Sequence, residues 1–178
     1  MKTNYRPISN LNTVGKIIER TCLARLLPHV ASTRNFSSLQ SAYRKRHSTE
    51  IALKILDDLY RIIDSKSAAV LIALDLSAAF DTIDHTVLLY RLKSTFGISG
   101  SALSWLQSYL NSPSQFVKVG SEQSLESAVT IGVPQGSVLG PFLFSANVSP
   151  IANIISSYGV HSHQYADDTV KYSCQIGS

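Results

Sequence analysis

The sequence predicts an α+β fold in which helices pack against a small sheet. Residues 70–74 form a continuous apolar run, which is typical of a strand buried on both faces. Residues 160–165 and 169–173 have the pattern of two strands joined by a turn. Apolar residues recur at helical spacing over residues 49–65, after Ser48 or Thr49, either of which can cap a helix. We expect this helix to pack against the sheet.

The composition is that of a folded chain with a modest positive charge. Hydrophobic residues make up 44% and charged residues 16% of the 178 residues, which excludes a disordered chain. The net charge of +4 allows a polyanionic partner without requiring one. Cys22 and Cys174 are too few for a disulfide framework or a zinc site, so we expect free thiols inside the cell, in the nucleus or the cytoplasm.

No membrane partner is expected. No apolar run approaches the roughly 20 residues that a membrane-spanning helix needs. The N-terminus, Lys-Thr-Asn-Tyr-Arg after Met1, lacks the charged and then apolar pattern of a signal peptide.

Three carboxylates lie where predicted strands end. Asp75 ends the apolar run, and Asp167 and Asp168 occupy the turn between the last two strands. Adjacent acids in a turn are often only solvated, since Asp is common in turns. An acid at the end of a core strand, however, needs a cation. If the two strands are neighbours in one sheet, the three carboxylates could hold two Mg²⁺ ions for phosphoryl chemistry. Asp57 and Asp58 form a second pair, which we expect to face solvent from a helix.

The remaining elements follow from caps and periodicity. Asn12 or Thr13 should cap a helix that ends before Pro28, with a buried stripe of Val14, Ile17, Ile18, Cys22 and Leu26. Asp84 should cap a helix over residues 86–96 that ends at Gly97, and Ser101 opens a shorter helix. A hairpin is expected over residues 116–131, a helix over residues 142–148 after Pro141, and a connection over residues 149–159.

Two further segments have the composition of nucleic-acid or phosphate contacts. Residues 43–47, Tyr-Arg-Lys-Arg-His, combine a dense positive charge with an aromatic ring that could stack on a base. Residues 132–137, Gly-Val-Pro-Gln-Gly-Ser, form a glycine-bearing turn that leads into a helix, which is a natural anion site or simply a tight turn.

Five motifs in order resemble one family, the reverse transcriptases of non-LTR (LINE-type) retrotransposons. They are residues 5–9 (Tyr-Arg-Pro-Ile-Ser), residues 40–44 (Gln-Ser-Ala-Tyr-Arg), Asp75 followed by Phe80, residues 132–137, and residues 165–168 (Tyr-Ala-Asp-Asp). The resemblance implies the fingers and palm of a right-hand polymerase, with an antiparallel palm sheet packed on helices. It assigns residues 1–66 to a fingers-like part that includes the long helix 49–65, and residues 67–178 to a palm interleaved with it.

The resemblance also implies a site and a reaction. Asp75, Asp167 and Asp168 would be catalytic, and Leu76 would join them in the metal site, with two Mg²⁺ ions or Mn²⁺ in their place. The incoming nucleotide would be bound by Arg6, Arg44, Phe80, Gln135 and Gly136. Phe80 would lie under the sugar and disfavour a 2′-hydroxyl, although from the sequence alone a core aromatic is the simpler interpretation. The reaction is attack of a primer 3′-hydroxyl on the α-phosphate of a deoxynucleoside triphosphate, directed by an RNA template.

The implied partners are an RNA template, a DNA primer and deoxynucleoside triphosphates. The chain stops ten residues after Asp168. We therefore expect a fragment without the thumb and endonuclease domains of its parent, with low or no activity alone. Two alternatives stay open: a non-catalytic remnant that folds and binds RNA–DNA hybrid, and a metal-dependent nuclease that uses the same carboxylates.

Overall fold

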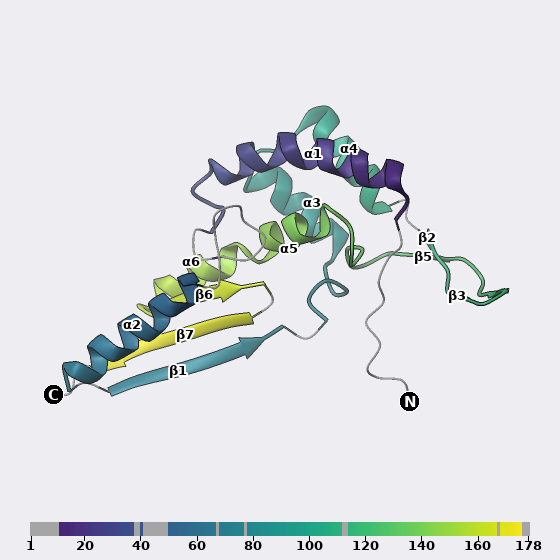
Figure 1. The fold of residues 1–178 in the computed structure, drawn as a ribbon. Helices are drawn as coiled ribbons and strands as arrows, with labels where there is room; N and C mark the ends of the chain where they lie inside the picture. Colours follow the sequence, from purple (N-terminus) through teal and green to yellow (C-terminus); the bar gives the residue numbers. More distant parts are fainter. Residues whose placement is uncertain are drawn as a thin grey trace. The chain divides into compact units, whose positions relative to one another are not determined.

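A computed structural model describes residues 11–37, 40, 50–66, 68–76, 78–111, 114–166 and 168–175 of the chain (Figure 1). The chain divides into two compact units, and each unit is built from two separate segments of the sequence. The first unit comprises Met1–Val30 and Phe80–Asn147, and the second comprises Ala31–Ala79 and Val148–Ser178. The assignment of residues 1–66 and 67–178 to fingers and palm stays a prediction.

The first unit is mainly helical. Its helices are α1 (Thr13–Ala31), α3 (His85–Ser94), α4 (Gly100–Asn111) and α5 (Gly140–Val148). Helix α5 is almost wholly buried, and Pro141 lies in its first turn, as predicted. The apolar core of the unit includes Val30, Leu88, Leu92, Phe96, Leu106, Leu110, Leu139, Leu143 and Phe144.

Helix α1 starts as the sequence predicts, but it buries a different face. The Asn12 side chain accepts a hydrogen bond from the Gly15 amide at 2.7 Å, so Asn12 is the cap. The predicted buried stripe is wrong for three of its five members, because Val14, Ile17 and Ile18 are 66%, 56% and 48% exposed. The buried residues are Glu19, Leu26 and Val30. Glu19 can replace an apolar residue there because its carboxylate is hydrogen-bonded, and periodicity does not reveal such a partner.

The predicted end of this helix before Pro28 is also wrong. Pro28 lies inside the last turn of α1, which continues to Ala31. Proline removes one helical hydrogen bond, but the turn is held by tertiary contacts instead. Val30 is fully buried, and the His29 ring donates from Nε2 to the Phe96 carbonyl at 2.8 Å.

Helix α3 follows its capping signals. The Asp84 side chain accepts a hydrogen bond from the Val87 amide at 2.9 Å, which confirms Asp84 as the cap of α3. Gly97 adopts a φ of +70°, and the next amide, that of Ile98, returns to the Leu92 carbonyl. On α4, the Trp105 and Tyr109 rings stack with centroids 5.5 Å apart.

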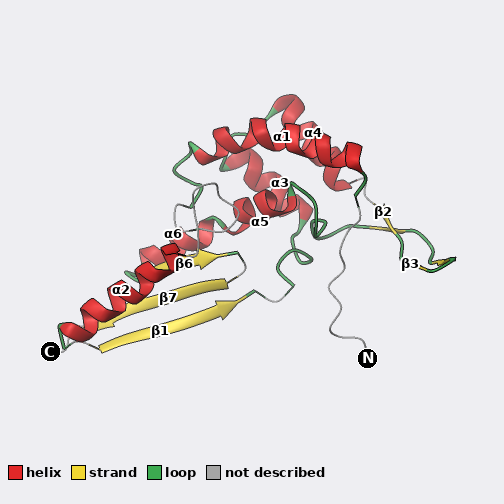
Figure 2. Ribbon diagram, viewed as in Figure 1, coloured by secondary structure: helices red, strands yellow, loops and turns green. Residues whose placement is uncertain are grey.

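The predicted hairpin of the first unit is present as two short ladders. Strand β2 (Ser114–Gln115) pairs with β5 (Ser127–Ala128), and β3 (Lys118–Val119) pairs with β4 (Glu122–Gln123). Gly120, at a φ of +62°, forms part of the turn that joins β3 to β4. Figure 2 shows these strands as short segments within a long loop excursion.

The second unit contains a three-stranded antiparallel sheet in the order β1-β7-β6. The strands are β1 (Ala68–Asp75), β6 (His161–Tyr165) and β7 (Asp168–Gln175). The sequence predicted the β6–β7 hairpin, which is confirmed, and the condition that the Asp75 strand lies beside this hairpin is met. Helix α2 (Glu50–Asp64) lies along this sheet in Figure 1 and packs against β1 and β6.

The expected burial of residues 70–74 on both faces is wrong. Val70, Ile72 and Leu74 are 56%, 49% and 41% exposed, and Leu71 on the other face is 50% exposed. The burial of a strand depends on the elements that cover each of its faces, and a continuous apolar run does not specify those elements. Conversely, the polar strand β6 buries Ser162, His163 and Gln164.

Helix α2 has one buried and one exposed face. Ile55 and Ile62 are buried, while Leu56 and Ile63 are exposed although they are apolar. Asp57 is exposed, as predicted, and pairs with Arg61 at 3.0 Å, whereas Asp58 is half-buried. The expected caps Ser48 and Thr49 lie outside the described residues.

Residues 149–159 contain a helix that the sequence analysis missed. Helix α6 spans Pro150–Ser157, with Pro150 at its first position and Ala152 and Ile155 buried. The proline was the available signal. Among the described residues, no helix is long and apolar enough to cross a membrane.

Candidate functional site

The end of the sheet brings together two of the predicted acidic positions. In the register of β1 and β7, Asp75 lies opposite Asp168 and Leu74 opposite Thr169. Directly opposed residues of an antiparallel pair have Cα atoms about 4.5–5.5 Å apart, and like charges in such a pair repel. Two acidic residues in register at a strand end therefore form a pair of positions that a cation would stabilise.

The turn between β6 and β7 is as short as a hairpin allows. Tyr165 pairs with Asp168, so only Ala166 and Asp167 lie between the strands. Ala166 has a φ of +55°, in the left-handed region that two-residue hairpin turns use. Asp167 itself lies outside the described residues.

A buried glutamine contacts this turn. Gln40 is 2% exposed, and its Oε1 accepts a hydrogen bond from the Ala166 amide at 3.1 Å. Its Nε2 donates to the Ala166 carbonyl, also at 3.1 Å. Sequence analysis placed Gln40 in a family motif but gave it no function, because no local pattern links residues 126 positions apart.

The donor set suits a hard divalent cation. Carboxylate oxygens are the ligands that Mg²⁺ prefers, and the backbone register brings the Asp75 and Asp168 positions together. Leu76 follows directly after β1 and is half-buried. Within the described part of the chain, no group of three or more His, Cys, Asp or Glu residues could hold a metal. The third predicted carboxylate, Asp167, is outside that part.

In the first unit, the glycine-bearing turn of residues 132–137 is tied to the segment that begins at Phe80. The Gly132 amide donates to the Ile83 carbonyl, and the Val133 amide donates to the Phe80 carbonyl, both at 2.8 Å. Gly132 has a φ of +84°, and a Cβ there would lie 3.0 Å from the Asp81 backbone. Close passage of two backbone segments therefore requires glycine at this position.

Gln135 has a partner on the same segment. Its Nε2 donates to the Asp81 carboxylate, at 3.2 Å from Oδ1 and 3.3 Å from Oδ2. Gly136, the next residue, is exposed and has a φ of +93°. No local pattern in the sequence links Gln135 to Asp81, which lies 54 positions earlier.

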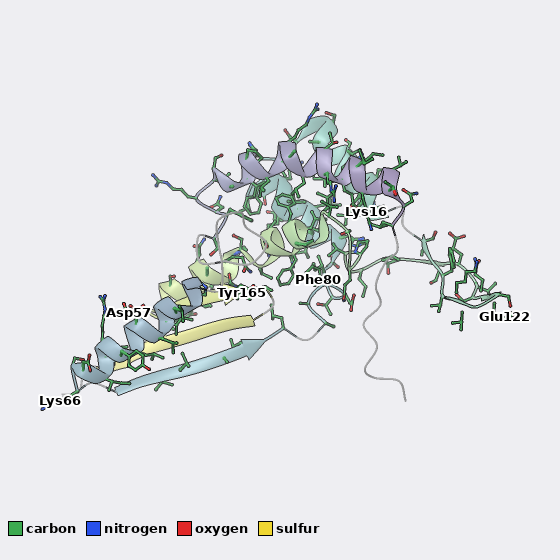
Figure 3. All side chains as sticks on the ribbon, viewed as in Figure 1. Lys16, Asp57, Lys66, Phe80, Glu122 and Tyr165 are labelled. Atoms are coloured by element: carbon green, nitrogen blue, oxygen red, sulfur yellow. The ribbon has the colours of Figure 1, made fainter. Side chains whose placement is uncertain are left out.

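Phe80 is half-buried and packs on a helix. Its ring stacks on that of Phe144 in α5, with centroids 4.9 Å apart and an angle of 24° between the rings. Figure 3 labels the Phe80 side chain. The contact fixes one face of the ring, as expected for a core aromatic, while the half-burial leaves part of the side chain accessible.

A buried carboxylate on α1, that of Glu19, supports the end of the glycine-bearing turn of residues 132–137. Glu19 accepts hydrogen bonds from the Tyr109 hydroxyl at 2.8 Å and from the Val138 amide at 2.5 Å. The Tyr109 hydroxyl also bonds the Ser137 side chain, whose Oγ accepts from the Gly140 amide at 2.8 Å. Burial, with Glu19 beside it, raises the pKa of Tyr109 well above its usual value.

A buried histidine contacts the same turn from α3. The His85 ring donates from Nε2 to the Gly132 carbonyl at 2.6 Å. The predicted nucleotide contacts Arg6 and Arg44 lie outside the described residues. The structure therefore brings Asp75 together with Asp168 in the second unit, and Gln135 together with Asp81 in the first.

The fold is similar to part of the fold of solved telomerases. A telomerase from Candida tropicalis, solved with a TWJ fragment of telomeric RNA, superposes with a TM-score of 0.64 at 13% identity, over 90% of this chain and 29% of that chain. The apo telomerase from Candida tropicalis that is truncated from its C-terminal domain gives a TM-score of 0.61 at 14% identity, over 88% of this chain and 34% of that chain. At these identities the likeness defines the fold, a mixed helix-and-sheet reverse transcriptase fold.

The chain belongs to the reverse transcriptase (RNA-dependent DNA polymerase) family, whose model matches residues 1–177. It is 34% identical over 173 residues to the RNA-directed DNA polymerase from mobile element jockey of Drosophila melanogaster, covering 93% of this chain. It is 33% identical to the probable RNA-directed DNA polymerase from transposon BS of the same species, over 80% of this chain. The chain spans 19% and 16% of the lengths of these two relatives. The resemblance to LINE-type retrotransposon enzymes is thereby confirmed.

Proposed function

We propose that this chain carries the catalytic carboxylates of an RNA-directed DNA polymerase and joins deoxynucleotides to a primer with two bound Mg²⁺ ions. The observation that supports this most is the opposition of Asp75 and Asp168 at the end of the sheet. Two acidic residues in such a register repel each other, and a divalent cation bound between them would remove this repulsion.

In this proposal each carboxylate has a defined task. Asp75 and Asp167 hold the two ions, and Asp168 assists from its position opposite Asp75. The backbone of Leu76 completes the metal site. When bound, the two ions would activate the primer 3′-hydroxyl as the nucleophile and stabilise the negative charge that develops on the pyrophosphate leaving group. The protein positions the reactants and neutralises charge, which accounts for most of the catalysis in phosphoryl transfer.

The nucleotide-binding roles rest on the family resemblance. Gln135 and Gly136 would contact the incoming nucleotide, and the hydrogen bonds from Gln135 to Asp81 support a fixed orientation for that amide. The accessible part of Phe80 would lie under the sugar and favour deoxynucleotides. Arg6 and Arg44 would bind the triphosphate as fixed cations.

The proposed partners are an RNA template, a DNA primer and deoxynucleoside triphosphates. The support is that the relatives are named as RNA-directed DNA polymerases and that a telomerase of the same fold was solved with RNA. A right-hand arrangement of fingers and palm is part of the proposal. Because the chain spans about a fifth of its jockey relative, we expect its activity alone to be low.

Primer extension tests this function. A DNA primer annealed to an RNA template is incubated with excess protein, Mn²⁺ or Mg²⁺, and the complementary triphosphate. We expect slow addition of one nucleotide by the wild-type chain and none by Asp167→Ala/Asp168→Ala. Shortening of the primer without triphosphate would indicate a nuclease instead. No extension by a folded, metal-binding chain would indicate a non-catalytic remnant.

A further inference from the structure

We propose that Gln40 is a positioning residue that holds the acidic turn in its metal-binding geometry by fixing Ala166 in the left-handed conformation. The inference rests on the proposed function, because the turn carries the Asp167 and Asp168 carboxylates. It concerns only the second unit, where all the contacts that carry it are found.

The conformation of Ala166 needs an external hold. Its φ of +55° is one that residues with a Cβ rarely adopt, since the side chain crowds the following carbonyl. Glycine or asparagine would occupy this position without such a penalty. The sequence has alanine there, so the short hairpin imposes an unfavourable conformation that a further interaction would stabilise.

The side-chain amide of Gln40 supplies that interaction in both directions. It accepts from the Ala166 amide and donates to the Ala166 carbonyl, both at 3.1 Å. The backbone N–H of Ala166 belongs to the peptide group that joins it to Tyr165. The backbone carbonyl of Ala166 belongs to the peptide group that follows it. Two bonds to two successive peptide groups fix the backbone rotation between them, and hence the direction in which the chain enters Asp167.

Gln40 is itself held in place. It is 2% exposed, so water does not compete for its amide. Its backbone forms a parallel bridge with Gln164, two residues before Ala166. The glutamine is therefore anchored on strand β6, beside the turn that it contacts.

A substitution that removes the two hydrogen bonds from Gln40 to Ala166 should release the turn without opening a cavity. Gln40→Met keeps the volume of the side chain and removes both hydrogen bonds. Ala166 would then relax toward negative φ, which changes the direction of the backbone after Ala166. Residues that orient metal ligands typically change metal affinity by about ten-fold or more when they are replaced.

Hydrogen exchange of the turn gives a metal-free readout. In the wild-type chain, the Ala166 amide should be protected by its bond to Gln40, and in Gln40→Met it should exchange about ten-fold faster. Gln40→Glu keeps the acceptor and should preserve part of the protection. Unprotected exchange of the Ala166 amide in the wild-type chain would overturn the proposal without any variant.

Mn²⁺ binding, measured by calorimetry on the same proteins, connects the Gln40–Ala166 contact to the metal site. Gln40→Met should weaken binding about ten-fold in the natural Ala166 background. In an Ala166→Gly background, where positive φ has little cost, the same change should weaken binding by about two-fold or less. Equal effects in both backgrounds would show that Gln40 does not act through Ala166.

The failure of this inference is distinguishable from failure of the proposed function. If Asp167→Ala/Asp168→Ala binds Mn²⁺ like the wild-type chain, the proposed metal site itself is wrong. If that variant loses Mn²⁺ while Gln40→Met binds it with wild-type affinity, the metal site stands and the role of Gln40 is refuted.

Discussion

Asp75 at the end of β1 lies opposite Asp168 at the start of β7, so the sheet opposes two acidic residues that are far apart in the sequence. An acidic residue at either position does not stabilise the strand. Asp is disfavoured in strands, and like charges directly opposite each other reduce the stability of a sheet. The arrangement is understandable when a cation is part of the folded, functional protein.

Removal of one of these charges should stabilise the metal-free protein. We expect Asp75→Asn to raise the free energy of unfolding by up to about 1 kcal/mol in EDTA, because the repulsion with Asp168 is lost. Mg²⁺ should stabilise the wild-type chain by mass action and have little effect on the variant. Thermal melts with and without Mg²⁺ measure both effects.

The matched control is Asp57→Asn. Asp57 lies on the exposed side of α2 and forms an ion pair with Arg61. Its replacement should cost about 0.5 kcal/mol or less and leave the response to Mg²⁺ unchanged. An equal loss of the Mg²⁺ response in both variants would refute a specific site at Asp75.

Gly132→Ala should be strongly destabilising. A Cβ at Gly132 would lie 3.0 Å from the Asp81 backbone, and the φ of +84° is unfavourable for alanine. We expect a loss of about 3 kcal/mol or more, from strain and clash together. Gly120 has a φ of +62° with open space around it, so Gly120→Ala should cost only about 1 kcal/mol. Urea unfolding compares the two variants, and equal costs would contradict the close approach.

Tyr109 should make the free energy of unfolding depend on pH in the alkaline range. Burial raises its pKa, so the folded protein keeps the phenol proton while the unfolded chain releases it above its ordinary value of about 10. The unfolded state then binds fewer protons, and the free energy of unfolding falls as the pH rises above about 10.

Tyr109→Phe isolates this contribution. The free energy of unfolding of the variant should be about 1–3 kcal/mol lower at neutral pH, because the hydroxyl that donates a hydrogen bond to Glu19 is missing. Its free energy of unfolding should then fall less steeply between pH 10 and pH 11 than that of the wild-type chain. Tyr158→Phe, at an exposed tyrosine, should keep the wild-type slope. A wild-type slope in Tyr109→Phe would contradict the prediction.

Asp81→Asn should weaken triphosphate binding through Gln135. The asparagine amide presents only one acceptor to the Gln135 Nε2, which now contacts both carboxylate oxygens. We expect the dissociation constant of the Mg²⁺-triphosphate to rise about three- to ten-fold, as measured by calorimetry. Asp84→Asn is the control, because asparagine caps a helix as well as aspartate does. If Asp81→Asn binds the triphosphate normally, Asp81 does not orient Gln135 for the nucleotide.

Local signals in the sequence predicted much of the fold. Asn12 and Asp84 cap the helices that they were expected to cap, and Pro141 lies in the first turn of α5. The hairpin of β6 and β7 also follows the prediction, and the condition that it lies beside β1 is met. These features depend on residues close in the chain, or on one apolar run paired with one hairpin.

The errors arise where tertiary contacts decide. Glu19 is buried on α1 because Tyr109 and Val138, about 90 and 119 positions away, satisfy its carboxylate. The apolar strand β1 is exposed, and composition does not reveal which faces of a strand other elements will cover. The contact of Gln40 with Ala166 is equally invisible in the sequence, since nothing local links a glutamine to a distant turn.

The most direct measurement of the central claim is the number of Mn²⁺ ions bound by the chain in the presence of a triphosphate and a primer–template, by electron paramagnetic resonance. The account predicts two ions in the wild-type chain and a clear loss of bound Mn²⁺ in Asp75→Asn, whose charge alone is changed. Wild-type occupancy in Asp75→Asn would contradict the assignment of Asp75 and the acidic turn as the metal site.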